Sequence, residues 1–311
     1  MPTPAKNTMK IITLDEINRA ARENPEQLIM QSERDYEKNI SAAARIVADR
    51  FAEKPIVLLS GPSGSGKTTT AHRVGEELGR LGINTLVISM DDYFIPNDLV
   101  PKEPDGSIDY EKPQRVDVEL LREHLGILSE CGTVTLPKFD FTTGTRLVGE
   151  TITRSADSAV IIEGIHALNP EVAGKCGDIA TCLYVSVRTR ISGKNGELLH
   201  PSKIRLMRRM SRDRLFRGRD ISQTIEMFGS VQRGENLYIM PHKGYSDFDI
   251  DTFFAYEICI YRRVIEELGG KKGELENGGL FAGLLPGFVS DTVTLSPQLI
   301  PDGSVIREFV G

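Results

Sequence analysis

Apolar residues in this chain form short continuous runs that alternate with longer stretches of helical periodicity. The runs are rich in β-branched residues, which is typical of strands buried on both faces of a sheet. The runs predict strands at residues 56–60, 84–89, 133–136, 158–164 and 180–187. The stretches of helical periodicity predict helices at 67–81, 116–129, 201–216, 221–239 and 251–267. This alternation predicts an α/β fold in three layers, with helices on both faces of a mainly parallel sheet.

The first 52 residues are polar and also have helical periodicity. The stretch from Thr13 to Glu16 is typical of a helix start, and residues 39–54 form a predicted amphipathic helix. We expect residues 1–52 to be an N-terminal helical extension packed on a main domain of residues 53–311, whose C-terminal helices and tail cover 251–311.

The stretch LLSGPSGSGKTTT, residues 58–70, joins the first predicted strand to the helix after it. From Gly61 to Thr68 it fits G-x-x-x-x-G-K-[ST], the P-loop pattern, in the strand–loop–helix context that this motif requires. Backbone N–H groups and the helix N-terminus would hold phosphates, Lys67 would reach the outer phosphates, and Thr68 would ligate magnesium. The predicted nucleotide-binding residues of the loop are Gly61, Ser63, Gly64, Ser65, Gly66, Lys67, Thr68 and Thr69.

Carboxylates follow two of the predicted strands. Glu163 ends one strand, where it suits a magnesium ligand, although a strand-end carboxylate without function has the same pattern. Asp91 and Asp92 follow another strand, at the edge of a parallel sheet where ligands bind. We favour Asp91 as the base that takes a proton from an attacking hydroxyl, while Asp92 fits a turn or helix cap better.

Arginines are concentrated in KIRLMRRMSRDRLFRGRD, residues 203–220, where Arg205, Arg209 and Arg212 share one helical face. Three interpretations are open: a nucleic-acid patch, a mobile lid that neutralises a transferring phosphoryl group, or a solvated charged face. The formal net charge of −6 favours a lid at about 201–220, because an acidic protein has no general affinity for nucleic acid.

Composition is that of an ordinary globular protein, with 40% hydrophobic and 26% charged residues. The four cysteines, Cys131, Cys176, Cys182 and Cys259, have no C-x-x-C spacing and fit thiols in a reducing compartment. We see neither a signal-peptide pattern at the start nor an apolar run of 18 residues, and we expect a cytoplasmic protein without a membrane span.

An ordered set of motifs resembles the uridine kinase/phosphoribulokinase family, and its bacterial uridine kinase, or nucleoside kinase, branch most closely. The motifs are GPSGSGKTTT, SMDDYF (89–94), IDYEKPQRVD (108–117), LPKFDFTTGTR (136–146), VIIEGIHALNP (160–170) and RRMSRDRLFRGRD (208–220). Residues 223–241 and the terminal SVIREFVG also resemble that branch, so the resemblance runs from about residue 40 to the end. It implies a P-loop kinase that uses ATP and Mg²⁺.

The resemblance implies roles at matching positions. Asp91 matches the base that deprotonates a ribose 5′-hydroxyl, and Asp109 matches a carboxylate that binds the ribose hydroxyls. Phe139 and Phe141 match aromatic residues of the nucleoside pocket, although a tyrosine is common at position 139. Glu163 matches the acidic residue near magnesium.

Four arginines match the family's lid and substrate-binding region. The resemblance implies a catalytic role for Arg212, a nucleotide contact for Arg217, and substrate contacts for Arg209 and Arg219. One position departs from the well-studied pyrimidine kinases, because Gly144 stands where a histidine reads the base. A glycine has no side chain to bond a base edge, so uracil specificity does not carry over.

The expected function is ATP- and Mg²⁺-dependent phosphorylation of a nucleoside 5′-hydroxyl, with uridine or cytidine as the first candidates, in pyrimidine salvage. One alternative is the same chemistry on another small alcohol, such as a sugar phosphate or pantothenate. A second is a nucleotide-binding regulatory or RNA-binding protein. The expected partner is a small-molecule substrate rather than a membrane or nucleic acid, and homo-oligomers occur among the relatives.

Overall fold

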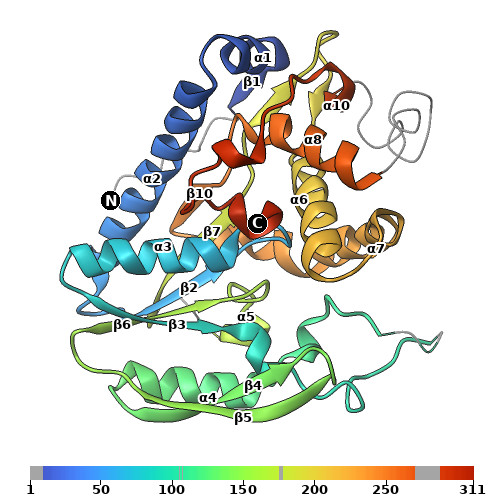
Figure 1. Cartoon of the computed structure of the whole chain (residues 1–311). Helices are drawn as coiled ribbons and strands as arrows, with labels where there is room; N and C mark the ends of the chain where they lie inside the picture. Colours follow the sequence, from blue (N-terminus) through green and yellow to red (C-terminus); the bar gives the residue numbers. More distant parts are fainter. Residues whose placement is uncertain (1–9, 105, 107, 175–177, 270–287) are drawn as a thin grey trace.

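The computed structural model describes residues 10–104, 106, 108–174, 178–269 and 288–311. Figure 1 shows a central sheet with helix α3 (Lys67–Arg80) on one side and helix α4 (Val118–Ser129) on the other. Cys176 and the glycine-rich stretch 270–287 lie outside the described residues.

The central sheet consists of five strands, all parallel to their neighbours. Their order is β10-β7-β2-β6-β3. The bounds are β2 (Ile56–Ser60), β3 (Asn84–Ser89), β6 (Ser158–Glu163), β7 (Ala180–Ser186) and β10 (Phe248–Asp251). Because all five strands point the same way, their carboxyl ends share one edge, and the loop after the middle strand β2 lies at the centre of that edge.

Alternate residues of β2 bury themselves in two different cores. Val57 and Leu59 pack with helices α2 (Pro25–Arg50) and α3, whereas Ile56 and Leu58 pack with α4 on the opposite face. The first core also includes α6 (Pro201–Phe216), α7 (Ile221–Gly234) and α8 (Glu257–Gly269), and the second includes α5 (Pro170–Ala173). The predicted α/β fold, with helices on both faces of a parallel sheet, is confirmed.

One predicted strand does not belong to the central sheet. Residues 133–136 begin β4 (Thr133–Asp140), which pairs antiparallel with β5 (Thr145–Thr153), a strand that the sequence did not predict. Buried Val134 and Leu136 alternate with exposed Thr133 and Thr135, so one face of β4 meets water, as is common in antiparallel ribbons. The predicted run of four residues was too short to identify this alternation of buried and exposed positions.

Two predicted helices have different bounds in the structure. The helix predicted at 251–267 begins at Glu257, because the residues before it form β10 and a short connection. The helix predicted at 221–239 leaves α-helical geometry after Gly234 and continues as a π-helical turn, η3 (Glu235–Ile239), and a 3₁₀ helix, η4 (Met240–Tyr245). Pro241 cannot donate a backbone hydrogen bond, which favours this change of geometry.

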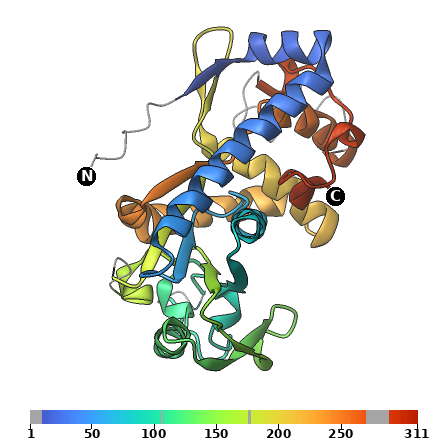
Figure 2. The same ribbon diagram turned by 90° about the vertical axis from the view of Figure 1, so that its left-hand side faces the viewer.

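The N-terminal segment contains β1 (Ile11–Thr13), α1 (Leu14–Glu23) and α2 (Pro25–Arg50). A capping box at Thr13 and Glu16 begins α1, and the Asn24 side chain with Pro25 begins α2. The predicted helix at 39–54 is thus the second half of a longer helix, which Figure 2 shows as a long diagonal element. Strand β1 was not predicted; it pairs with β8 (Arg190–Ser192), and β9 (Leu198–Leu199) completes this small sheet.

The buried side chains of α1 and α2 belong to the same core as β2 and α3. No boundary between cores lies at residue 52, and the division of the chain there stays a prediction. The remaining short elements are η1 (Met90–Tyr93), η2 (Pro113–Arg115), α10 (Phe288–Asp291), η5 (Pro297–Leu299) and α11 (Arg307–Val310). Among the described residues, no helix combines the length and the apolar character needed to cross a bilayer.

Candidate active site

The loop between β2 and α3 depends on its glycines. Gly64 and Gly66 have φ values of 74° and 83°, which side-chain-bearing residues adopt only with strain. At Gly61, an added Cβ would lie 2.0 Å from the carbonyl oxygen of Val185. The loop therefore has the tight, side-chain-free shape that lets phosphate oxygens approach the backbone at the N-terminus of α3.

A buried ion pair contacts the backbone of the P-loop. Arg205 donates two hydrogen bonds to Glu235, at 2.6 and 2.7 Å, and both side chains are buried. Glu235 accepts the Ser63 N–H at 3.0 Å, and Arg205 donates to the Ser63 carbonyl at 2.8 Å. Because both backbone groups of Ser63 are bound, the pair fixes the loop's position. Sequence reasoning missed Glu235, whose partners lie far away in the chain.

Glu163 lies at the carboxyl end of β6 beside the predicted magnesium residue Thr68. Its Oε1 accepts the Thr68 hydroxyl at 3.0 Å and the Ser89 hydroxyl at 3.2 Å. These are hard oxygen donors of the kind Mg²⁺ prefers, and Mg²⁺ commonly takes few protein ligands together with phosphates and waters. The described residues contain no group of three or more His, Cys, Asp or Glu side chains placed to hold a metal. The donor set fits Mg²⁺ bound together with a polyphosphate.

Asp91 and Asp92 have different surroundings. Asp92 accepts hydrogen bonds from Lys138 at 3.1 Å and from the Phe139 N–H at 3.3 Å, so it ties η1 to β4. Asp91 faces Glu163 and Lys67. Burial, and to a lesser extent the charge of Glu163, raise the pKa of Asp91 to about 6, while Lys67 opposes the rise.

Aromatic rings from two segments form one cluster next to this turn. The rings of Phe94, Phe139 and Phe141 contact one another edge to face, with centroids 5.1 to 6.3 Å apart. The buried Arg115 guanidinium lies 4.7 Å from the Phe94 ring centroid and 4.8 Å from that of Tyr110. Phe139 is buried, whereas Phe141 is 66% exposed and offers its surface to a ligand.

Gly144 has a structural reason to be glycine. Its φ is 68°, and an added Cβ would lie 2.1 Å from Nδ2 of Asn97. Asn97 thus occupies the space where a side chain at position 144 would begin. Its Oδ1 accepts a hydrogen bond from Arg115 at 3.2 Å, and its backbone N–H donates to the Gly144 carbonyl at 2.9 Å. Sequence reasoning did not single out Asn97, because nothing local marks it.

Asp109 lies near a second group of buried polar side chains. Its Oδ1 accepts the Glu111 N–H at 3.0 Å. Burial first and the charge of Glu235 second raise the pKa of Glu111 to about 7, whereas Lys67 and Arg209 act in the opposite direction. Burial lowers the pKa of His166 to about 4. Asp109 itself is half-buried and lies beside Glu111.

The arginines of α6 are mostly not solvated. Arg208 is fully buried and makes an ion pair with Glu257 at 2.9 Å, so it is structural. Arg205 and Arg209 are buried too, and Arg209 donates to the Ser63 hydroxyl at 2.6 Å. The interpretation of α6 as a solvated charged face is therefore wrong. These three buried arginines also do not form the exposed cationic face that binding of nucleic acid would require.

Four predicted arginines converge on one carboxylate that was not predicted. Asp213 is fully buried, and the nearest nitrogens of Arg209, Arg212, Arg217 and Arg219 lie 3.3 to 3.9 Å from its oxygens. Neither carboxylate oxygen of Asp213 has a hydrogen-bond partner among the described residues. Four cations share one anion at loose distances, so the cluster retains positive charge and suits an additional anion such as a phosphoryl group.

The C-terminal segment also reaches the P-loop. Glu308, on α11, accepts the Thr69 hydroxyl at 2.7 Å, and its carboxylate lies 3.9 Å from Arg212. Val305 lies so close to Gly66 that an added Cβ there would be 2.6 Å from its Cγ1. Glu308 is a further residue that sequence reasoning missed, since 239 positions separate it from Thr69.

Several known proteins are similar to this chain. Residues 56–258 match the model of the Phosphoribulokinase / Uridine kinase family. A uridine kinase of Lactobacillus helveticus is 34% identical over 197 residues, which are 63% of this chain and 85% of that protein. A uridine kinase of Bacillus pumilus is 33% identical over 62% of this chain and 85% of its own length. A solved structure described as a possible uridine kinase from Bacillus stearothermophilus has a TM-score of 0.47 at 20% identity, covering 70% of this chain and 98% of that one.

Proposed function

The chain belongs to the phosphoribulokinase/uridine kinase family and is a phosphotransferase acting on an alcohol group; we propose that its acceptor is the 5′-hydroxyl of a nucleoside. The observation that carries this proposal is the aromatic cluster beside Asp91. Asp92 binds the Phe139 N–H, so the turn that carries Asp91 also anchors the rings of Phe139 and Phe141. A flat base on the exposed Phe141 ring suits this arrangement.

The donor in this proposal is ATP, held by the P-loop. The loop backbone, Ser65 and the N-terminus of α3 bind the phosphates, and Lys67 neutralises the outer ones. Thr68 and Glu163, whose oxygens lie 3.0 Å apart, would hold Mg²⁺. The bound ion would offset charge on the transferring phosphates.

Asp91 is the general base. Its side chain lies at the edge of the sheet with Glu163 and Lys67, and its raised pKa makes it a stronger base than an exposed aspartate. It accepts the proton of the ribose 5′-hydroxyl, while Asp109 binds the other ribose hydroxyls. The reaction needs little more than this positioning and charge neutralisation.

The arginine cluster around Asp213 stabilises the phosphoryl group in transfer. Arg209 already bonds the P-loop through Ser63, and Arg212 lies close to the tail at Glu308. Arg217 and Arg219 have exposed fractions of 48% and 40%, so they can reach a ligand at the mouth of the site. Residues 201–220 then act as a lid over the donor.

Asn97 takes the place of the base-reading side chain that Gly144 lacks. Its carboxamide adjoins the aromatic cluster and has both a donor and an acceptor for a pyrimidine edge. This part of the proposal makes uridine and cytidine the first candidates.

The proposed location is the cytoplasm, where the three described cysteines, Cys131, Cys182 and Cys259, would stay the free thiols that they are in the structure.

The competing acceptor is another small alcohol. A coupled assay of ADP release, with ATP, Mg²⁺ and a panel of nucleosides, sugar phosphates and pantothenate, separates the two. We expect uridine or cytidine to be turned over with the highest kcat/KM. Equal or faster turnover of a non-nucleoside alcohol would contradict the proposal while leaving the family assignment intact.

A further inference from the structure

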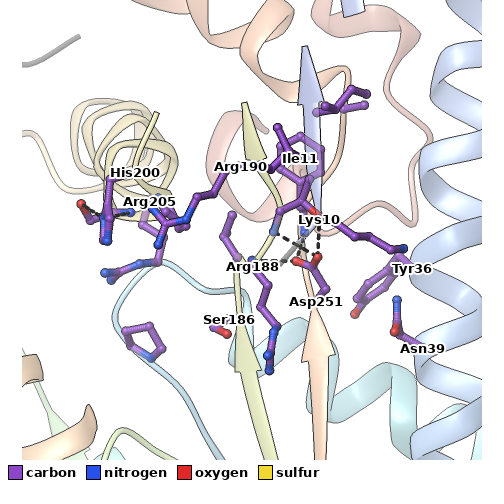
Figure 3. A pocket seen from close by; sticks show the side chains of 18 of the residues that line it. Lys10, Ile11, Tyr36, Asn39, Ser186, Arg188, Arg190, His200, Arg205 and Asp251 are labelled. Carbon is purple, nitrogen blue, oxygen red and sulfur yellow. Dashed lines mark hydrogen bonds between the residues drawn. The ribbon is translucent and has the colours of Figure 1, made fainter. Parts of the chain in front are cut away.

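A cavity of about 550 Å³ lies behind the P-loop, outside the set of residues assigned to catalysis. Figure 3 shows its walls: Lys10 and Ile11 from the N-terminal segment, Tyr36 and Asn39 from α2, Arg188 and Arg190 near β8, and His200 and Arg205 at α6. None of Lys67, Asp91, Asp109 or Glu163 lines it. Its volume lies within the range of cavities that hold small ligands.

One wall of the cavity comes from outside the segment that matches the family model. The match covers residues 56–258, whereas Lys10, Tyr36 and Asn39 precede it. The extension therefore does more than cover a core, because it closes a space over the ends of β7 and β10. This space is a feature of the longer chain, not of the matched segment alone.

The charges around the cavity are mostly positive. Five cationic side chains line it, Lys10, Arg188, Arg190, Arg205 and Lys243, against the two carboxylates Asp35 and Asp251. Asp251 is satisfied within the fold: it accepts hydrogen bonds from the backbone of Arg188 at 2.8 Å and from the Thr189 hydroxyl at 2.8 Å. Arg205 is paired with Glu235. Arg188 is paired with Asp249. The cationic side chains that remain to attract an anion therefore include Lys10 and Lys243.

Two lysines of the cavity stand out. Among the described residues, neither Lys10 nor Lys243 has a carboxylate within ion-pair distance. The Lys243 ammonium instead lies 5.2 Å from the Tyr184 ring centroid, and burial, followed by the charge of Arg188, lowers the Lys243 pKa. Nearby positive charge also acts on His200, whose pKa is lowered by burial first and then by the charges of Arg190 and Arg205. An anion would relieve this concentration of charge.

Aromatic and aliphatic side chains form other parts of the lining, together with polar residues such as Asn39 and Ser186. Tyr36, Tyr184 and Phe253 contribute rings, and Ile12 and Val187 contribute aliphatic surface. Cations beside rings suit a molecule that combines an anionic group with a flat apolar part. We propose that this cavity binds a small phosphate ester that carries an aromatic ring, at a site separate from the donor and acceptor sites.

Contacts of the cavity wall reach the catalytic loop. Pro62 lines the cavity, and its carbonyl is 3.4 Å from the ammonium of Lys67. The Tyr36 hydroxyl bonds that of Thr70, in the first turn of α3, at 3.0 Å. A ligand that prefers one position of Pro62 or Tyr36 therefore changes donor affinity at the P-loop, because the two sites share these residues.

Pyridoxal 5′-phosphate is a suitable probe, since it is a ring-bearing phosphate ester whose aldehyde forms an imine with lysine. We would treat the full chain with it, reduce with borohydride, and map modified lysines by mass spectrometry. We expect Lys10 and Lys243 to be modified at tenfold lower probe concentration than the exposed Lys194, which lies outside the cavity. Saturating ATP should protect Lys67 but not these two.

Arg190→Gln should reduce modification of Lys243 at least fivefold and leave Lys194 unchanged, and Lys10→Gln serves if that variant does not fold. Modification of Lys10 and Lys243 no faster than Lys194 would overturn the proposal. So would protection of both by ATP in parallel with Lys67, because it would place the probe in the donor site.

Coupling to the loop has its own readout. Phenyl phosphate should change the KM for ATP at least twofold in the wild type and leave it unchanged in Arg190→Gln. An unchanged KM in the wild type would overturn the coupling. The labelling experiment does not depend on the identity of the acceptor alcohol.

Discussion

Asp91 and Asp92 are adjacent in the chain, yet their side chains have separate tasks. Asp92 is bound by Lys138 and by the Phe139 N–H, so its charge is already used within the fold. Asp91 faces Lys67 and Glu163 in a poorly hydrated position. These different surroundings support the sequence-based preference for Asp91 as the base and for Asp92 as a structural carboxylate.

Asp91→Asn should lower kcat by about 10²–10⁴-fold, because the amide cannot accept the hydroxyl proton. Steady-state kinetics with the best nucleoside measures this. Binding of ATP should change little, since Lys67 and the loop remain. Asp92→Asn is the matched control and should retain most of kcat. A larger loss in Asp92→Asn than in Asp91→Asn would assign the base to Asp92.

The raised pKa of Asp91 also predicts a pH dependence. The base must be deprotonated, so kcat/KM should fall about tenfold per pH unit below about pH 6 and level off above it. A pH profile of the wild type measures this limb, and the limb should disappear in Asp91→Asn. A wild-type profile that is flat from pH 5 to 8 would contradict the assignment.

Asn97 shows that a local sequence pattern does not reveal contacts between distant parts of the chain. The P-loop motif is local, so its residues could be predicted from the sequence. Asn97 gains its significance only because the turn at Gly144 has a φ of 68° and folds back against it. That contact joins two positions whose proximity depends on β4 and β5, and β5 was itself not predicted.

Asn97→Ala should reduce kcat/KM for uridine about tenfold, equivalent to about 1.4 kcal/mol, because a base-edge hydrogen bond is lost. The effect should appear mainly in KM. Asn84→Ala, at an exposed position of β3, serves as the control. Unchanged kinetics in Asn97→Ala would remove Asn97 from the base-binding group.

Among the elements, the arginines of α6 have different surroundings from those that their spacing in the sequence suggested. Its arginine spacing suggested one cationic face, but their ion-pair partners divide the arginines into a structural group and a group proposed to bind phosphate. Arg208 pairs with Glu257, and Arg205 with Glu235, whereas Arg209 and Arg212 lie at Asp213. These partners lie on other helices or inside the same one, so local periodicity could not separate the two groups.

Asp213→Asn should lower the free energy of unfolding by about 3 kcal/mol, because four arginines lose the buried anion between them. Urea denaturation measures it. Pyrophosphate should restore more stability to this variant than it adds to the wild type. Asp220→Asn, which loses only an exposed pair with Arg214, should change stability by less than about 1 kcal/mol. Equal effects of the two substitutions would contradict the role of the cluster.

Helix α11 places Glu308 where donor phosphates approach Thr69 and Arg212. Since a carboxylate repels phosphates, Glu308→Gln should lower the Kd for ATP about two- to tenfold. Calorimetric titration measures it, with Asp302→Asn as a control at an exposed position of the same tail. Weaker ATP binding in Glu308→Gln would show instead that Glu308 positions Thr69 or Arg212 for the donor.

At the scale of the whole molecule, the sequence predicted the parallel sheet and its helices because short apolar runs mark the strands and helical periodicity marks the helices. It did not predict how the two ends of the chain contribute. The N-terminal segment shares the core of the sheet and closes the cavity behind the P-loop, while the C-terminal tail reaches the front of the loop. Both contacts join residues far apart in sequence, for which no periodic pattern exists.

A chain that begins at residue 53 should therefore not unfold cooperatively. It would expose the core positions that pack against α2, whose Ala43, Ala44 and Val47 are fully buried. Circular dichroism in a urea series measures this, with a chain that begins at residue 10 as the control. Cooperative unfolding with wild-type stability from residue 53 onward would show that the extension is dispensable for the fold.

The proposed transfer of a phosphoryl group to a nucleoside 5′-hydroxyl is tested most directly by ³¹P NMR of the product formed from ATP, Mg²⁺ and uridine. We expect a new phosphate ester resonance that is split by the two protons at C5′. Splitting by a single proton would indicate a 2′ or 3′ ester and contradict the placement of Asp91. The absence of any ester from uridine or cytidine would contradict the proposed acceptor.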